Sequence, residues 1–159
     1  MRTPRLYTPQ PLPLGQTIEL EAAAGHYIGK VLRMQEKQEV ILFNDDGTQV
    51  SAHISNISKK IVRVLISAQL EAPKASVLHT HLGQVMSRGE RMDYAIQKAT
   101  ELGVNEITPL LSSRCEVKLD HQRQIKRLAH WQQIAISACE QSGRIDVPLI
   151  HAPQTLNTW

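Results

Sequence analysis

LGQVMSRGERMDYAIQKATELGVNEITPLLSSRC, residues 82–115, has the pattern of a strand, a helix and a second strand in close succession. Ser87 and Glu90 have the spacing of a capping box, which predicts the beginning of a helix. Apolar residues then recur every three or four positions, as on one face of a helix: Met92, Ala95, Ile96, Ala99 and Leu102. Gly103 can take the positive φ that often ends a helix. The segment therefore predicts a β-α-β unit.

The same alternation of strands and helices continues on both sides of this segment. We expect strands at 77–85, 107–111 and 147–150, with helices at 88–102 and 120–142 between them. Asp120 is a good N-cap and Gly143 a good stop for the long helix. Its expected apolar face consists of Ile125, Leu128, Ala135, Ala138 and Cys139. Alternating units of this kind predict an α/β fold with a parallel sheet and right-handed crossovers.

The last residues extend this pattern without completing it. Residues 153–156, PQTL, resemble the start of a further helix, but only three residues follow them. A parallel sheet of three strands is half of an ordinary α/β domain. We therefore expect the chain to be a fragment, or to be completed by a partner.

Residues 1–72 have a different character and predict a small, β-rich unit. Short strands are expected at 5–7, 17–20 and 38–43, followed by two more around 50–54 and 61–66. A short helix is expected at 22–33, with Ile28, Val31 and Leu32 inward, and residues 44–47, NDDG, predict a hairpin turn. Several short strands at close spacing indicate a small barrel. Residues 71–74, EAPK, break the pattern, so we place the boundary between the two domains, 1–72 and 73–159, there.

Composition limits the compartment and the class of protein. The chain has 159 residues, 42% of them hydrophobic and 21% charged, with a net charge of +3. These values are ordinary for a soluble globular protein, and the mildly basic balance is compatible with a polyanionic partner. The two cysteines have no disulfide-framework spacing, which favours a reducing compartment. Without an apolar leader or a long apolar run, the sequence predicts a cytoplasmic protein with no membrane contact.

Polar residues gather at four places in the second domain where packing does not require them. These are the helical stripe Arg91, Gln97, Lys98 and Glu101; Arg114 at a strand end; Glu140 and Arg144 around the end of the long helix; and Gln84, Ser87 and Arg88 after the first strand. Ligands in open α/β sheets bind outside the carboxyl ends of the strands, so these residues could line an anion site. The alternative for the stripe is a solvated helix face with i,i+3 ion pairs.

Metal and nucleophile chemistry are weakly indicated. His79 and His81 could ligate a metal together with Cys115 or Cys139, but no tight ligand spacing supports this. Neither cysteine lies at an electropositive helix N-terminus, and no glycine-rich phosphate loop is present. We expect no metal site.

Long segments resemble one known family. MSRGERMDYAIQKATELGVNEITPLLSSRCEVK (86–118) and WQQIAISACEQSGRIDVP (131–148), together with RLY (5–7) and HYIGKVLR (26–33), resemble RsmE-type 16S ribosomal RNA uridine-N3 methyltransferases of the SPOUT superfamily. The resemblance runs from about Arg5 to the end of the chain. One departure is Lys37, where the family usually has glycine in the turn before a strand. We expect this turn to avoid φ > 0.

The resemblance implies a PUA-like RNA-binding barrel at 1–72 and a partial SPOUT methyltransferase domain at 73–159. In the family, S-adenosylmethionine binds in a C-terminal knot that this chain lacks, so no cofactor-binding residue is expected here. The intact enzyme would be a homodimer that methylates N3 of a uridine in 16S ribosomal RNA of the small subunit. The alternatives are a non-catalytic RNA-binding module and an interaction protein without an RNA role.

Site residues follow from this resemblance and from the polar clusters. Lys98 and Arg114 are expected near the substrate, with Glu101 and Glu140 as orienting partners. Gln97 stands where related SPOUT families have a functional arginine. The residues expected to contact RNA are Arg5, Arg33, Lys59, Lys60, Arg88, Arg91 and Arg144. The alternative for the basic residues of the barrel is ordinary surface charge.

Overall fold

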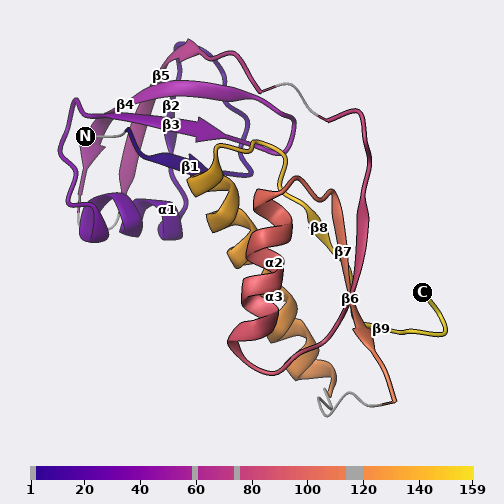
Figure 1. The fold of residues 1–159 in the computed structure, drawn as a ribbon. Coiled ribbons are helices and arrows are strands. Elements are labelled where there is room, and N and C mark those ends of the chain that lie inside the picture. The colour runs from indigo at the N-terminus through magenta and orange to yellow at the C-terminus, as the bar shows by residue number, and fades with distance from the viewer. Residues whose placement is uncertain (1–2, 59–60, 74–75, 114–119) are drawn as a thin grey trace. The chain divides into compact units, whose positions relative to one another are not determined.

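The computed structural model describes residues 3–58, 61–73, 76–113 and 120–159, and Figure 1 shows its helices and strands. The chain divides into two compact units, Met1–Lys74 and Ala75–Trp159. Each unit has its own sheet and its own hydrophobic core. No helix in the described part of the chain is both long and apolar enough to span a bilayer.

The second unit contains the parallel sheet that the sequence predicts. Its four strands are β6 (His81–Val85), β7 (Glu106–Leu111), β8 (Leu149–Ile150) and β9 (Gln154–Thr155). β6 pairs along one side of β7, while β8 and β9 pair with the first and last parts of β7 on its other side, and all pairs are parallel. The α/β class is thus confirmed, with β7 at the centre of the sheet.

Two helices pack against one face of this sheet, α2 (Glu90–Glu101) and α3 (His121–Ser142) (Figure 1). Their shared core with the sheet includes Met92, Ile96, Ile107, Trp131 and Ile150, each at most 4% exposed. The limits of α3 follow the sequence prediction. Asp120 Oδ1 accepts a hydrogen bond from the Arg123 amide at 2.8 Å, and Gly143 closes the helix at φ 93°.

The start of α2 differs from the predicted capping box. Gly89 is the N-cap residue, with φ 58°, and no side chain caps the helix. The turn from β6 into α2 requires a positive φ, which glycine adopts at little cost. Ser87 lies two residues too early to act as the cap, so the capping-box interpretation was wrong.

Some predicted apolar positions in this unit are exposed. Leu102 is 88% exposed because it follows the last residue of α2, and Ile125 is 56% exposed near the start of α3. β6 begins at His81 rather than at Val77, which is fully exposed. Only the part of α3 that packs against α2 and the sheet has a buried face. The helical period of the sequence does not show at which residue this packing begins.

The segment after β8 is not the start of a helix. Gln154 and Thr155 pair with Leu110 and Leu111 as β9, and Leu156 continues the ladder with an amide hydrogen bond to the Leu111 carbonyl at 3.0 Å. The last part of β7 had backbone groups available on that side, and β9 satisfies them. The expected helix at 153–156 is therefore replaced by a fourth strand.

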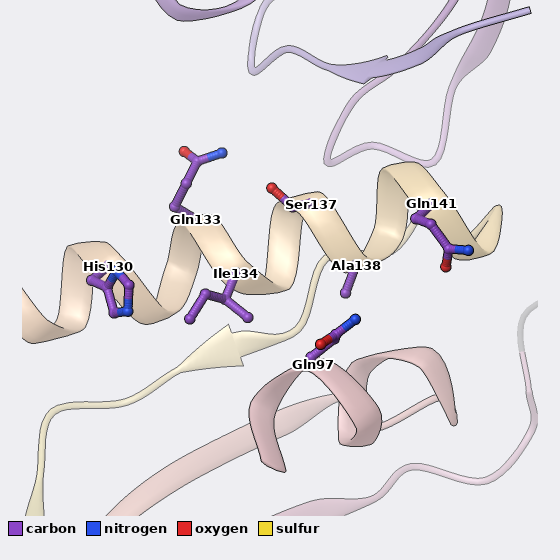
Figure 2. Close-up of a pocket in the computed structure, with 7 residues that line it drawn as sticks. All are labelled: Gln97, His130, Gln133, Ile134, Ser137, Ala138 and Gln141. Carbon is purple, nitrogen blue, oxygen red and sulfur yellow. The ribbon is translucent and has the colours of Figure 1, made fainter. Parts of the chain in front are cut away.

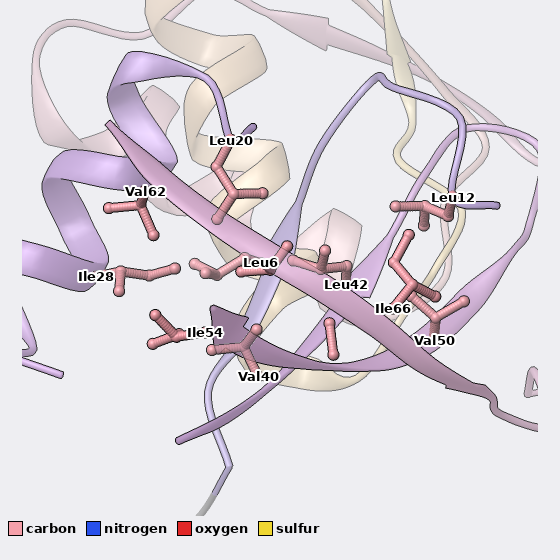
Figure 3. Packing of buried hydrophobic residues seen from close by; sticks show 12 residues of the cluster. Leu6, Leu12, Leu20, Ile28, Val40, Leu42, Val50, Ile54, Val62 and Ile66 are labelled. Atoms are coloured by element: carbon pink, nitrogen blue, oxygen red, sulfur yellow. The ribbon is translucent and has the colours of Figure 1, made fainter. Parts of the chain in front are cut away.

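The first unit is built on a five-stranded sheet. Its strands are β1 (Arg5–Tyr7), β2 (Thr17–Glu19), β3 (Glu39–Phe43), β4 (Gln49–Ile57) and β5 (Val62–Gln69), in the order β1-β3-β4-β5-β2. β1 and β3 are parallel, and the other pairs are antiparallel. β5 alternates buried and exposed residues, and its apolar side chains join those of β3 and β4 in one core (Figure 3). The predicted strands and the β-rich character are present.

Two local predictions in this unit need correction. The helix expected at 22–33 consists of α1 (Ala22–His26) followed by a π-helical turn, η1 (Tyr27–Val31). Ile28 is fully buried there as predicted, but Val31 is 59% exposed. Lys37 does adopt a positive φ of 70°, contrary to the expectation that its turn avoids one. The backbone of the turn therefore keeps the conformation that suits glycine.

Candidate functional site

Three residues of the polar stripe on α2, Gln97, Lys98 and Glu101, form a hydrogen-bonded group. Glu101 Oε2 accepts from Lys98 Nζ at 2.7 Å, and Glu101 Oε1 accepts from Gln97 Nε2 at 3.0 Å. The hydrogen bond from Lys98 is the main reason that the pKa of Glu101 lies below its ordinary value, with a smaller contribution from Gln97. Lys98 Nζ also lies 5.8 Å from the ring centroid of Tyr94. The helix thus presents a positioned ammonium group beside an ionised carboxylate.

The stripe adjoins a hollow between α2 and α3. Gln97 lines it from α2, and its amide lies next to Ala138 of α3 (Figure 2). The hollow has a volume of about 370 Å³, and its other lining residues are His130, Gln133, Ile134, Ser137 and Gln141. Three side-chain amides and one hydroxyl are among its mainly apolar lining, so the hollow can hydrogen-bond a polar, uncharged group. Sequence reasoning missed the α3 residues, although their spacing of three and four marks one helix face.

Arg144 has a structural role in this unit. Its Nη1 donates to the backbone carbonyls of Thr100 at 2.7 Å and Val104 at 2.9 Å, and its Nη2 bonds with Asp146. Its side chain is only 13% exposed. The guanidinium therefore adds a charged donor to one carbonyl in the last turn of α2 and to one just after the helix, where the backbone has few donors of its own. These contacts account for Arg144 without RNA.

The remaining predicted residues of the second unit lie in different places. Arg88 and Arg91 are exposed around the first turn of α2, and Glu140 is partly buried near the end of α3. Arg114 is outside the described residues. The structure thus brings Gln97, Lys98 and Glu101 together on α2, with Glu140 on the other helix.

The predicted RNA contacts of the first unit are also spread over its elements. Arg5 on β1 donates to Gln49 Oε1 at 2.7 Å, and its Cζ lies 4.9 Å from the Phe43 ring centroid. Arg33 is exposed after η1 with φ 50°. Lys59 and Lys60 lie outside the described residues. Arg33 therefore offers its charge to solvent, whereas Arg5 is partly engaged in packing.

Three histidines of the second unit meet on the sheet, away from Cys139. His79, His81 and His151 surround Glu106, and Cys139 is buried on α3 with its Sγ 3.7 Å from the Asp146 carbonyl oxygen. Cys115 is outside the described residues. The sequence interpretation paired the histidines with cysteines and missed Glu106 and His151, because these join them only through strand pairing.

The hollow beside Gln97 does not fit S-adenosylmethionine. The hollow beside Gln97 is lined by side chains of α2 and α3 alone. A nucleoside cofactor needs a concave site in which most of its surface is buried and a few polar groups converge. This hollow instead opens widely between two helices, so we derive no reaction step from it.

Comparison with known proteins identifies the class. Residues 73–159 match the family model described as RNA methyltransferase domain, and residues 20–67 match that described as RNA methyltransferase PUA domain. The first match covers more than half of the chain, so the chain belongs to this RNA methyltransferase family. The second match confirms the PUA-like assignment of the β-rich unit.

Three similar proteins carry methyltransferase names. Ribosomal RNA small subunit methyltransferase E of Buchnera aphidicola subsp. Schizaphis graminum is 38% identical over 99% of this chain and 64% of its own length. A methyltransferase structure from Legionella pneumophila with bound SAM has a TM-score of 0.96 at 42% identity, covering 99% of this chain and 65% of that one. The enzyme E structure from Neisseria gonorrhoeae, bound to S-adenosyl methionine, has a TM-score of 0.91 at 39% identity and covers 96% of this chain and 62% of that one.

These similarities confirm the RsmE-type resemblance and its fold. They also show that the chain spans just under two thirds of the length of the relatives it matches.

Proposed function

We propose that this chain is part of an S-adenosylmethionine-dependent ribosomal RNA methyltransferase. The observation that carries the proposal is the RNA methyltransferase domain match over residues 73–159, the part of the chain that contains the parallel sheet. Residues 1–72 would bind RNA, and residues 73–159 would form part of the methyl-transfer domain. The PUA match at 20–67 supports the first assignment.

The substrate we propose is N3 of a uridine in 16S ribosomal RNA. N3 lies on the Watson–Crick edge of uracil, so the base must be unpaired and out of the stack when it reacts. Loss of the N3 proton leaves negative charge on the uracil oxygens, which a nearby cation would stabilise. Lys98 would be this cation; its ammonium group is oriented by Glu101, and the Gln97 amide donates to the same carboxylate. Arg114 and Glu140 remain proposed partners in this site.

RNA contacts outside the reacting base would come from exposed cations. Arg33 in the first unit, Arg88 just before α2 and Arg91 in its first turn are exposed and suited to phosphate. Arg5, Lys59 and Lys60 complete the proposed set. The whole enzyme would act on the small ribosomal subunit in the cytoplasm and would be a homodimer.

We propose that the methyl-donor site belongs to the part of the relatives that this chain does not match. The similar structures with bound cofactor are about half as long again as this chain, and the hollow beside Gln97 does not enclose a nucleoside cofactor. Residues 1–159 alone should therefore not bind S-adenosylmethionine in calorimetry. Binding with ordinary affinity would disprove this placement.

Two measurements test the function. Residues 1–159 should retard 16S ribosomal RNA in a gel, and the shift should disappear at high salt because phosphate contacts dominate. The protein at the length of its relatives should introduce a methyl group that blocks reverse transcription, since an N3-methyl group prevents Watson–Crick pairing.

Variants of that longer protein connect the reaction to Lys98. Lys98→Met should lower the methylation rate, while Lys126→Met, an exposed lysine on α3, should not. If the longer protein binds RNA but leaves all its uridines unmodified, the alternative of a non-catalytic RNA-binding module is supported instead. If it neither binds nor modifies RNA, the interaction-protein alternative remains.

A further inference from the structure

A cluster of three histidines and one carboxylate lies on the face of the second sheet opposite α2 and α3. His81 and Glu106 are register partners on β6 and β7. Ile107 follows Glu106 on β7, and its register partner Ile150 precedes His151. Both isoleucines face the helices and belong to the core. Side chains alternate along strands, so Glu106, Thr108 and His151 point to the other face. The proposed reaction does not use these residues.

The distances within the cluster are those of a nearly assembled ligand set. Glu106 Oε2 lies 2.6 Å from His151 Nε2 and 4.0 Å from His81 Nδ1. The three ligand atoms offered by His81, Glu106 and His151 all lie within 4.8 Å of one another. In a tetrahedral zinc site with bonds of about 2.1 Å, neighbouring ligand atoms are about 3.4 Å apart. The separations of these atoms would change by at most about 1.4 Å to reach that value, which rotation of surface side chains can supply.

Two further side chains orient the cluster as outer-shell groups do at metal sites. His81 Nε2 lies 2.8 Å from Thr108 Oγ1, and the Thr108 side chain is fully buried. When Nε2–H donates to that hydroxyl, the Nδ1 lone pair is free and faces Glu106. The other carboxylate oxygen, Oε1, lies 2.7 Å from His79 Nε2. Hydrogen bonds of this kind fix ring tautomers and carboxylate orientation at metal centres.

We propose that His81 Nδ1, Glu106 Oε2 and His151 Nε2 bind a divalent transition metal of the zinc class, with His79 and Thr108 as supporting partners. Two imidazoles and one carboxylate suit zinc and its neighbours better than magnesium or calcium, which prefer oxygen ligands. The three ligand side chains are about one-third exposed, which leaves room for a water as fourth ligand. The metal would tie the beginnings of β6 and β7 to the residue after β8.

The position argues for a structural or regulatory ion. His81 and Glu106 are the first residues of their strands, at the amino-terminal edge of the parallel sheet. Substrates in open α/β sheets bind at the carboxyl edge. Binding is therefore expected to raise the thermal unfolding temperature, because the metal binds the folded state.

The test is a zinc titration of the chain by calorimetry at pH 7.5, followed by cobalt substitution. We expect one ion per chain and visible cobalt bands of a tetrahedral site with nitrogen and oxygen ligands. The affinity should fall at pH 5.5, where protons compete for the imidazoles. Absence of binding, or a sulfur-to-cobalt charge-transfer band that assigns the ion to cysteine, would overturn the proposal.

Variants locate the ion. His151→Asn and Glu106→Gln should lower the affinity by more than the roughly 10–100-fold that loss of an outer-shell partner costs, and His79→Ala should fall within that range. The matched control is His130→Asn, because His130 pairs with Asp93 at 2.9 Å on the helices, away from the cluster. It should leave the affinity unchanged. Binding that is insensitive to His151→Asn but lost with His130→Asn would refute the site.

An experiment on the unmodified chain covers the case in which a variant does not fold. Imidazole resonances of His81 and His151 should shift on addition of one equivalent of zinc, while those of His26 and His53 should not. Shifts confined to other histidines would contradict the assignment.

Discussion

Arg144 Nη1 donates to the backbone carbonyl of Thr100 at 2.7 Å, and thereby joins the loop after α3 to the last turn of α2. The two residues are 44 positions apart in the sequence. A second bond from the same nitrogen, to the Val104 carbonyl at 2.9 Å, extends the contact to the start of the segment leading into β7. These two hydrogen bonds of Arg144, called the Arg144 clasp below, fix the C-terminal end of α2, the helix that carries Lys98 and Glu101.

Removing the Arg144 clasp should destabilise the second unit. Arg144→Met leaves two carbonyls without their charged donor, and hydrogen bonds to charged groups each contribute about 1.5–3 kcal/mol. We expect the free energy of unfolding to fall by about 2 kcal/mol or more, measured by urea denaturation. Arg123→Ala is the control, because its ion pair with Asp120 is exposed and should contribute less than about 1 kcal/mol. Equal losses in the two variants would contradict the role of Arg144.

Removing the side-chain hydroxyl of Thr100, unlike removing Arg144, should not destabilise the second unit. The Thr100 hydroxyl oxygen is buried and has no hydrogen-bond partner among the described residues. Thr100→Val removes that group while keeping the shape, so stability should stay constant or rise by up to about 1 kcal/mol. Thr100→Ser keeps the hydroxyl and loses a methyl group, which should cost about 1 kcal/mol. Thermal unfolding of the two variants checks this, and a marked loss in Thr100→Val would mean that the hydroxyl has a partner.

Lys37 occupies a backbone conformation that suits glycine, with φ 70°. A residue with a Cβ atom pays roughly 1–2 kcal/mol there, part of which glycine returns through its greater entropy in the unfolded chain. Lys37→Gly should therefore stabilise the first unit by about 0.5–1 kcal/mol in denaturant unfolding. The amide hydrogen bond to Ile54 at 2.8 Å is retained. Lys37→Ala should give no such gain, because alanine meets the same steric cost.

The carboxyl of Glu101 should make stability depend on acid pH. Its folded-state pKa lies below the ordinary value, mainly because Lys98 donates to it. The unfolded carboxyl titrates near about 4.3, so the stabilisation is complete above that pH and is lost as the pH falls through the folded pKa. The thermal unfolding temperature of Glu101→Gln should therefore fall less below about pH 4.3 than that of the natural chain.

Which hydrogen bond lowers the pKa of Glu101 more can be measured by carbon NMR of its carboxyl group. Lys98→Met should raise its pKa more than Gln97→Ala, because the bond from Lys98 is the larger cause. The reverse order would show that the amide is the more important donor.

Helix caps and turn residues predicted much of the fold, because each of these features depends only on residues close together in the sequence. Asp120 and Gly143 mark the two ends of α3, and the turn at 44–47 closes with Gly47 at φ 76°. The capping box at Ser87 failed because the turn before α2 needed a glycine with positive φ, and a matching side-chain pattern two residues earlier did not show this.

The candidate site was predictable only where its members lie on one helix. Gln97 and Lys98 each lie about one helical turn before Glu101, so their hydrogen bonds to its carboxylate follow from the spacing. His130 and Ser137 line the same hollow from α3, and Glu106 meets His151 across strands, through contacts between segments distant in the chain.

The sequence by itself determined the succession of strands and helices, the ends of α3 and the family, because periodicity, capping and turn chemistry act over a few residues. Only the tertiary structure decided that residues 154–155 complete the sheet as β9, that Arg144 supports α2, and that three histidines share one carboxylate. The reason is physical: each of these depends on which backbone groups and which charges are left without partners after the strands have paired.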